Sequence, residues 1–120
     1  MKIAFTTSGK SLDAPMDSRF ARAPWVLVYD LETLTFNLLE NEANRKSDES
    51  AGVKTAKMIV QSGAGVVVTG HCGPSAFRIL TIAGVRVSRT SAITVAKALD
   101  LYSSGSLAEI ETPDMSGHWV

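Results

Sequence analysis

Three consecutive valines at residues 66–68, bounded by Gly65 and Gly70, constrain the fold of this chain more than any other feature. An unbroken β-branched run between glycines is typical of a strand that is buried on both faces of a sheet. The segments before and after it, residues 51–62 and 74–83, have the apolar spacing, the early proline and the terminal glycines of helices. A buried strand between two helices predicts an α/β sheet with parallel neighbouring strands and right-handed crossovers.

The remaining patterns complete this sheet. Further strands are predicted over residues 2–7, 25–30, 34–39 and 85–88, and a third helix runs to about residue 104 with Ser91 or Thr94 as its cap. Residues 25–39 form an antiparallel hairpin, and the polar residues 41–50 form a loop. We therefore predict a mixed five-stranded sheet with helices on its faces over residues 1–105, followed by an irregular tail over residues 106–120.

Composition limits the class of protein. A chain of 120 residues with 45% hydrophobic side chains fits one domain with a core. Twelve basic residues balance twelve acidic ones, which argues against a nucleic-acid coat. The single cysteine can form neither an internal disulfide nor a four-thiolate metal site in a monomer. No apolar run approaches the ~20 residues that span a bilayer, and no signal peptide is evident, so we expect a cytoplasmic domain that binds no membrane.

Polar residues follow the predicted parallel strands at the point where each strand ends. Ligands of open α/β sheets bind outside these carboxyl ends, so residues 8–22, 70–74 and 88–90 should meet at one edge, which we call the rim. The rim would gather cationic and soft side chains and the N–H groups of two helix N-termini, which favour anions. These side chains are Arg19, Arg22, His71, Cys72 and Arg89. Each arginine taken alone can equally be a solvated surface residue.

His71 and Cys72, followed by Arg78, also have the spacing of a cysteine-dependent phosphatase or arsenate reductase loop. A thiol at a helix N-terminus is a good nucleophile because the helix stabilises its thiolate. Against this alternative, Pro74 removes one N–H from the oxyanion cradle, and a small thiol can simply fill the end of a strand. His118 is more simply a surface histidine than a metal ligand.

Three segments together resemble the dinitrogenase iron–molybdenum cofactor biosynthesis family: residues 2–24, residues 65–80 and GVRV at 84–87 with the helix that follows. The resemblance rests mainly on the patterns Asp17-x-x-Phe20-x-x-x-Pro24 and Gly70-x-x-Gly73-Pro74-x-Ala76-Phe77. It covers about residues 1–105. It implies a ribonuclease H-like three-layer α/β fold that lacks the nuclease carboxylates.

The resemblance also implies a function. Family members bind or carry molybdenum-containing metal–sulfur clusters, and one small member holds a molybdenum–copper sulfide cluster. We therefore expect a non-enzymatic carrier of such an anionic cluster, or of a molybdenum–iron–sulfur precursor, with cluster-handling ATPases as partners. A plain protein-interaction module is a further alternative. Because the cluster brings its own sulfide, the chain needs no array of thiolates.

The residues expected to contact the cluster lie on the rim and the helix behind it. Members devoted to the nitrogenase cofactor often place a histidine where this chain has Arg19, so electrostatic capture is favoured over direct ligation. The arginines would supply charge, Phe20 and Phe77 apolar walls, and His71 and Cys72 soft contacts. The expected contacts are Ser8, Arg19, Phe20, Arg22, His71, Cys72, Gly73, Pro74, Phe77 and Arg89.

Overall fold

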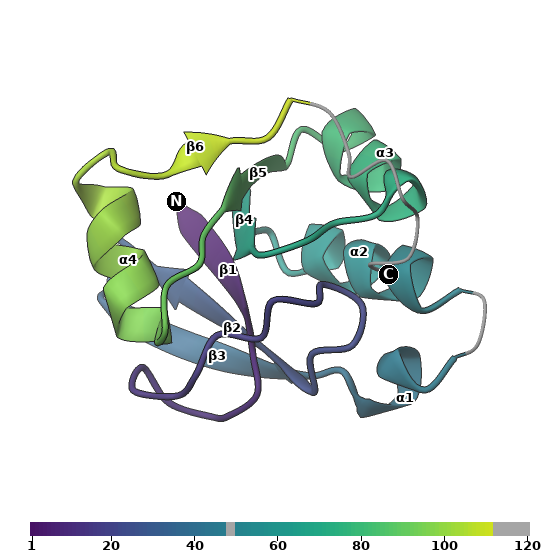
Figure 1. Ribbon diagram of the computed structural model, residues 1–120, viewed down its shortest axis with the longest axis horizontal. Helices are drawn as coiled ribbons and strands as arrows, with labels where there is room; N and C mark the ends of the chain where they lie inside the picture. Colours follow the sequence, from purple (N-terminus) through teal and green to yellow (C-terminus); the bar gives the residue numbers. More distant parts are fainter. Residues whose placement is uncertain (48–49, 112–120) are drawn as a thin grey trace.

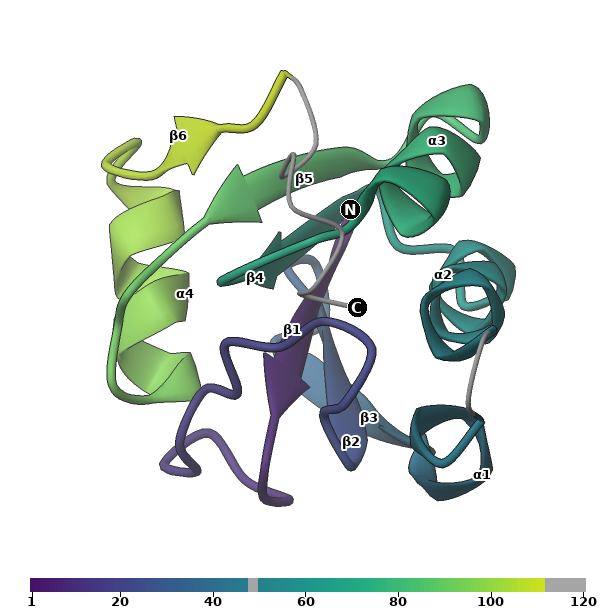
Figure 2. The ribbon, with the colours of Figure 1, turned by 45° about the vertical axis from the view of Figure 1, so that its right-hand side comes forward.

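One sheet separates two layers of helices in the computed structural model, which describes residues 1–47 and 50–111. Helices α2 and α3 lie side by side on one face, and α4 covers the other (Figures 1 and 2). The strands are β1 (Lys2–Thr7), β2 (Trp25–Asp30), β3 (Thr35–Glu40), β4 (Val66–Thr69), β5 (Arg86–Arg89) and β6 (Ala108–Glu109). The helices are α1 (Glu42–Arg45), α2 (Ala51–Gln61), α3 (Pro74–Ile82) and α4 (Val95–Ser103).

The strand order is β3-β2-β1-β4-β5-β6. Strands β1, β4 and β5 are parallel neighbours, whereas β2 pairs antiparallel with both β1 and β3. This mixed α/β arrangement confirms the predicted parallel strands and hairpin and the three-layer, ribonuclease H-like fold that the resemblance implies.

Strand β4 is buried on both faces, as its three valines predict. Val67 packs into the core under α2 and α3, together with Ile59 and Leu80. Val66 and Val68 point the other way, into the core under α4. Successive side chains of a strand alternate between its faces, so one apolar run supplies both cores.

Strand β6 adds a sixth strand to the five that were predicted. It lies in the segment that was expected to be irregular and pairs antiparallel with β5, through Ser88 with Glu109 and Arg89 with Ala108. The chain reverses at Gly105, whose φ of 73° is readily adopted by glycine, and then covers part of the open edge of β5. A strand of two residues has no periodicity by which the sequence could have revealed it.

Other boundaries differ slightly from the prediction. Helix α1 occupies part of the expected polar loop, and β3 begins at Thr35 because Leu34 adopts a φ of 61° in the hairpin turn. Thr94 caps α4, accepting a hydrogen bond from the N–H of Lys97. Within the described part of the chain, no helix has the length and apolar character needed to cross a membrane.

Candidate functional site

The three loops of the predicted rim meet at the carboxyl ends of β1, β4 and β5. The loop between β1 and β2 runs alongside His71, whose N–H donates to Ser18 O over 2.7 Å and whose carbonyl accepts from Phe20 N over 3.1 Å. The segment after β5 joins them, because Thr90 N donates to Thr69 O over 3.0 Å. Backbone hydrogen bonds therefore hold the rim loops together.

Gly70 allows the loop from β1 to approach the end of β4 closely. A Cβ built on Gly70 would lie 2.7 Å from both Cβ and O of Ser18 and 2.8 Å from its Cα. Separations this short leave no room for any side chain, and the obstructing atoms include backbone that is itself hydrogen-bonded. Glycine at this position is thus a geometric requirement of the rim.

A buried pair of hydroxyls supports the rim from beneath. Thr6 Oγ1 and Thr69 Oγ1 lie 2.8 Å apart, joining β1 to β4, and the Thr6 hydroxyl also contacts Asp17 O over 2.8 Å. The Asp17 carboxylate accepts a hydrogen bond from Arg19 N over 3.0 Å and lies 3.3 Å from Arg19 Nε. These bonds fix the path of the loop just before it reaches His71.

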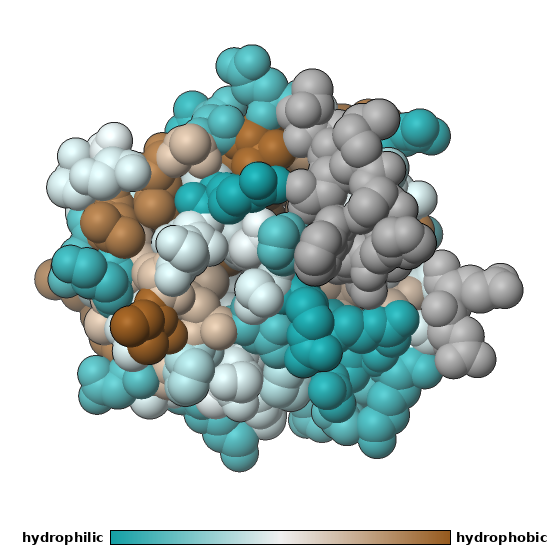
Figure 3. All heavy atoms as spheres, in the orientation of Figure 1, coloured by the Kyte–Doolittle hydropathy of each residue, from teal (hydrophilic) through white to brown (hydrophobic). Residues whose placement is uncertain are grey.

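A surface depression of about 340 Å³ lies at the rim, and we call it the rim depression. Its described lining residues carry hydroxyl groups, an imidazole and a guanidinium, and none of them carries a carboxylate. The surface over α1 and the adjoining part of the β1–β2 loop is also hydrophilic (Figure 3). The lining residues are Ser18, Gly70, His71, Arg89, Thr90, Ser91 and Ala108.

Only two of the expected contact residues, His71 and Arg89, line this depression. Arg19 lies next to it, paired with His71 through an isolated β-bridge, and its side chain is 55% exposed. Gly73, the N-cap of α3, is buried behind His71. Ser8 is exposed elsewhere in the loop, where its N–H donates to Pro15 O over 3.2 Å.

Arg22 is turned toward α1 and away from the depression. Its guanidinium donates to the carbonyls of Arg45 and Ser47, while Arg45 Nε donates to Arg22 O over 2.8 Å. Carbonyls at a helix C-terminus lack intrahelical donors and attract cations. At the end of α1, the ammonium of Lys46, the C-cap, is bonded to Glu42 and lowers the pKa of that carboxyl. Arg22 was expected to supply charge at the rim, but its guanidinium instead joins the β1–β2 loop to α1 and the residues after it.

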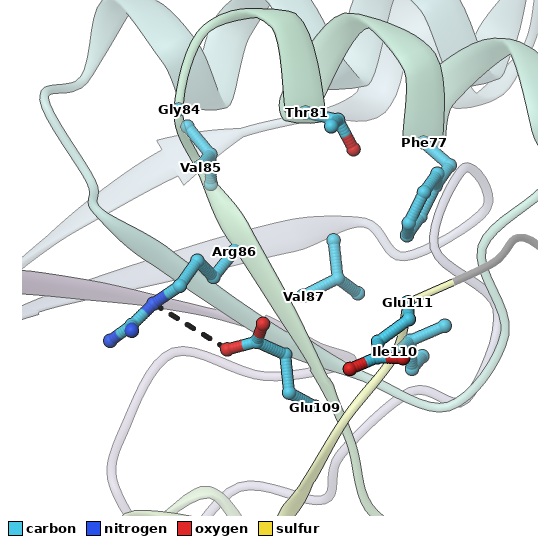
Figure 4. Close-up of a pocket in the computed structure, with 9 residues that line it drawn as sticks. All are labelled: Phe77, Thr81, Gly84, Val85, Arg86, Val87, Glu109, Ile110 and Glu111. Carbon is cyan, nitrogen blue, oxygen red and sulfur yellow. Dashed lines mark ion pairs between the residues drawn. The ribbon is translucent and has the colours of Figure 1, made fainter.

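The two expected apolar walls also lie elsewhere. Phe20 is fully buried in the core under α2 and α3. Phe77 points into a separate cavity of about 280 Å³ between α3, β5 and the segment after β6, opposite Val87 and Ile110 (Figure 4). Pro74 is exposed and lines a hollow on the outer side of α3. None of the described residues that line the rim depression is a phenylalanine, tyrosine or tryptophan.

Helix α4 offers fewer N-terminal donors than expected. The N–H of Val95 donates to Ala14 O over 3.0 Å, and that of Ala96 donates to Leu12 O over 2.7 Å. The N–H of Lys97 donates to the side chain of Thr94. The loop from β1 thus occupies these positions, and the expectation of two open helix N-termini at the rim is wrong for α4.

The thiol of Cys72 is placed for packing. Cys72 is 1% exposed within the core under α2 and α3, and its Sγ lies 3.9 Å from Gly73 O. Arg78 is exposed and lines the outer hollow beside Pro74. A nucleophile must reach its substrate, so this geometry does not support the phosphatase or arsenate reductase alternative.

Metal ligands do not cluster in the described residues. Across residues 1–47 and 50–111, no group of three or more His, Cys, Asp or Glu side chains is placed to hold a metal ion. His118 lies outside these ranges.

Several lining residues were not among the expected contact residues. Ser18, Gly70 and Thr90 lie within the predicted rim segments, and Ser91 follows directly. Their position just after the parallel strands was therefore the feature of the sequence that could have identified them. Ala108 reaches the depression through the pairing of β6 with β5, which no sequence pattern indicated.

The chain was then compared with known proteins. The sequence profile of the family described as dinitrogenase iron-molybdenum cofactor matches residues 1–105, which confirms the resemblance. No curated protein matches the chain significantly.

Two solved structures are similar in both sequence and fold. The apo form of the orange protein from Desulfovibrio gigas is 34% identical, with a TM-score of 0.90 and coverage of 94% of this chain and 95% of that one. A putative NifB protein from Thermotoga is 32% identical, with a TM-score of 0.85 and coverage of 97% and 98%. A putative dinitrogenase from Methanocaldococcus jannaschii, at 18% identity and a TM-score of 0.69 over 94% and 97% of the chains, shares the fold.

Proposed function

The chain belongs to the dinitrogenase iron–molybdenum cofactor family, and we propose that it carries an anionic molybdenum-containing metal–sulfur cluster in the rim depression without catalysing a reaction. The cargo we favour is a molybdenum–copper sulfide cluster. A molybdenum–iron–sulfur precursor is the related cargo that the same site would accept.

The observation that carries this proposal is the lining of the depression. Among the described residues, Ser18, Thr90 and Ser91 line it together with His71 and Arg89, so its lining combines hydroxyl-bearing, imidazole and guanidinium side chains. Hydrogen-bond donors and positive charge favour an anion. The volume of about 340 Å³ lies at the lower end of the range of small-molecule sites.

The chemistry of the cargo suits a site without protein thiolates. Soft metals such as copper(I) prefer sulfur ligands, and a thiomolybdate supplies sulfides that complete the coordination of both metals. The chain then needs only to recognise the outer surface of a preformed anion. The buried Cys72 is consistent with this division of roles.

Reconstitution tests the proposal directly. The full chain is mixed with tetrathiomolybdate and copper(I), desalted and examined for visible absorption and bound molybdenum. We expect coloured protein, and we expect Arg89→Gln to bind markedly less cargo because it removes the guanidinium from the lining.

Arg86→Gln is the matched control, because Arg86 lies on the same strand but faces Glu109 at 3.6 Å outside the depression. It should bind cargo as the unaltered chain does. Absence of protein-bound absorption from the unaltered chain overturns the proposal, and equal losses in both variants overturn the location.

A further inference from the structure

Two apolar hollows lie along the outer side of α2 and α3, away from the rim depression. One, of about 320 Å³, lies between the helices and includes Val60 and Ile79. The other, of about 330 Å³, includes Pro74 and Phe77. Ile82 lines both hollows and is 80% exposed. We call this surface, over residues 57–61 and 74–83, the α2–α3 face.

The charges on this face have one sign. The charged side chains of this face are Lys57 and Arg78. Lys54, the remaining charged residue of the two helices, lies outside the face and donates to Ser47 Oγ. Neither helix carries a carboxylate, although the whole chain is neutral. Lys57 lies at one hollow and Arg78 at the other. The face therefore combines an apolar centre with a cationic border.

From this pattern we propose that the α2–α3 face binds an acidic amphipathic helix of a partner protein. Apolar side chains spaced at three and four residues would fill the two hollows on either side of Ile82, as in other helix-in-groove complexes. Carboxylates on the flanks of that helix would face Lys57 and Arg78. Helix α3 has nine residues, so its length of about 13 Å matches two to three turns of a partner helix.

The helices in the described part of the chain do not provide this occupant. Among the described elements, α2 and α3 carry only basic charges, α4 carries Lys97 and Asp100, and α1 has only four residues. Charge complementarity therefore favours a different protein over a second copy.

A peptide titration tests this proposal on the full chain without any cluster. The probe is a synthetic helical peptide with leucines on one face and glutamates elsewhere, and a control peptide replaces every glutamate by lysine. We expect backbone amide shifts to change along α2 and α3 with the acidic peptide, and much weaker binding of the basic one. The preference should decrease at high salt, because the paired charges are exposed.

Matched variants locate the contact. Ile82→Asp should weaken binding of the acidic peptide by about tenfold or more, because it removes the central apolar contact and adds a like charge. Ile93→Asp is the control, since Ile93 is also 80% exposed but precedes α4. The double variant Lys57→Glu, Arg78→Glu should reverse the preference and bind the basic peptide.

Three results overturn the proposal: equal binding of the two peptides, shift changes away from α2 and α3, or equal effects of the two aspartate variants. Sedimentation of the chain alone provides a fourth. Self-association that Ile82→Asp abolishes and Ile93→Asp preserves would assign the face to a second copy instead.

Discussion

The rim depression and the α2–α3 face are built by opposite means. The depression is assembled from loops that lie far apart in the sequence, and main-chain hydrogen bonds such as that between His71 N and Ser18 O hold them together. The α2–α3 face is formed by two regular helices, whose packed sides bury Ile59 and Leu80 while Ile82 projects outward.

The difference predicts how each region responds to change. A loop-built site depends on a few close approaches, so a small added group beneath it can abolish binding without touching the ligand. A helix face tolerates most surface substitutions and responds mainly to the residue at its centre. The comparison can be tested with substitutions that affect one region and leave the other intact.

The largest effect is expected from Gly70→Ala. The added methyl would lie 2.7 Å from Ser18, so the loop must move, and overpacking of this kind costs about 1–3 kcal/mol of unfolding free energy. Cargo binding should be lost while the acidic peptide still binds the α2–α3 face. Chemical denaturation and reconstitution measure the two effects.

Gly65→Ala is the control for this substitution. Its new Cβ would meet only the Met1 side chain, at 3.6 Å, which is an ordinary contact. Normal cargo binding by Gly70→Ala would contradict the idea that close approach of the loops builds the depression.

Gly70 also illustrates what the sequence could and could not reveal. It belongs to the pattern that carries the family resemblance, yet its role is to let two chain segments approach. Phe20, from the other pattern, is fully buried, and Gly73 is the N-cap of α3. Much of the recognisable pattern therefore specifies the geometry of the rim, whereas the cargo contacts that we propose come from residues such as Arg89 and Thr90, which line the depression.

The fold followed from the sequence where side chains repeat with a period. The valines of β4 and the apolar spacing of α2 predicted the parallel sheet, and the parallel sheet predicted which loops would meet. Loop side chains have no such period, so their directions could not be inferred. Arg22 was expected at the rim but contacts α1. This helix has only four residues, and no sequence pattern predicted it.

A smaller effect is expected from Thr69→Val, which removes the hydroxyl paired with Thr6 beneath the rim. Losing one net hydrogen bond costs about 1 kcal/mol of unfolding free energy. Because Thr6 donates its one hydroxyl proton to Asp17 O, Thr69 is the donor in the pair, and Thr69→Val leaves the buried Thr6 oxygen without a donor beside the loop. The loop should therefore shift and cargo binding should weaken. Thermal unfolding and cargo titration measure both quantities.

Thr55→Val is the control for Thr69→Val, because it removes a buried hydroxyl from helix α2. Thr55 is also buried and donates to Asn41 Oδ1 over 3.2 Å, but it lies on α2, away from the rim. Both variants should lose similar stability, and only Thr69→Val should bind cargo less well. Equal weakening of cargo binding would mean that it follows global stability and does not depend on the hydroxyl pair.

The smallest effect on cargo binding is expected at Cys72, which follows His71 in sequence but packs in the core under α2 and α3. Its thiol should resist alkylation until the chain unfolds, because Cys72 is 1% exposed. Cys72→Ala should cost about 1 kcal/mol of unfolding free energy through lost packing and leave cargo absorption unchanged. If this variant kept its stability but lost the absorption, the sulfur would be a ligand. In that case Cys72 would belong to the cargo site, although it is buried in the core under α2 and α3.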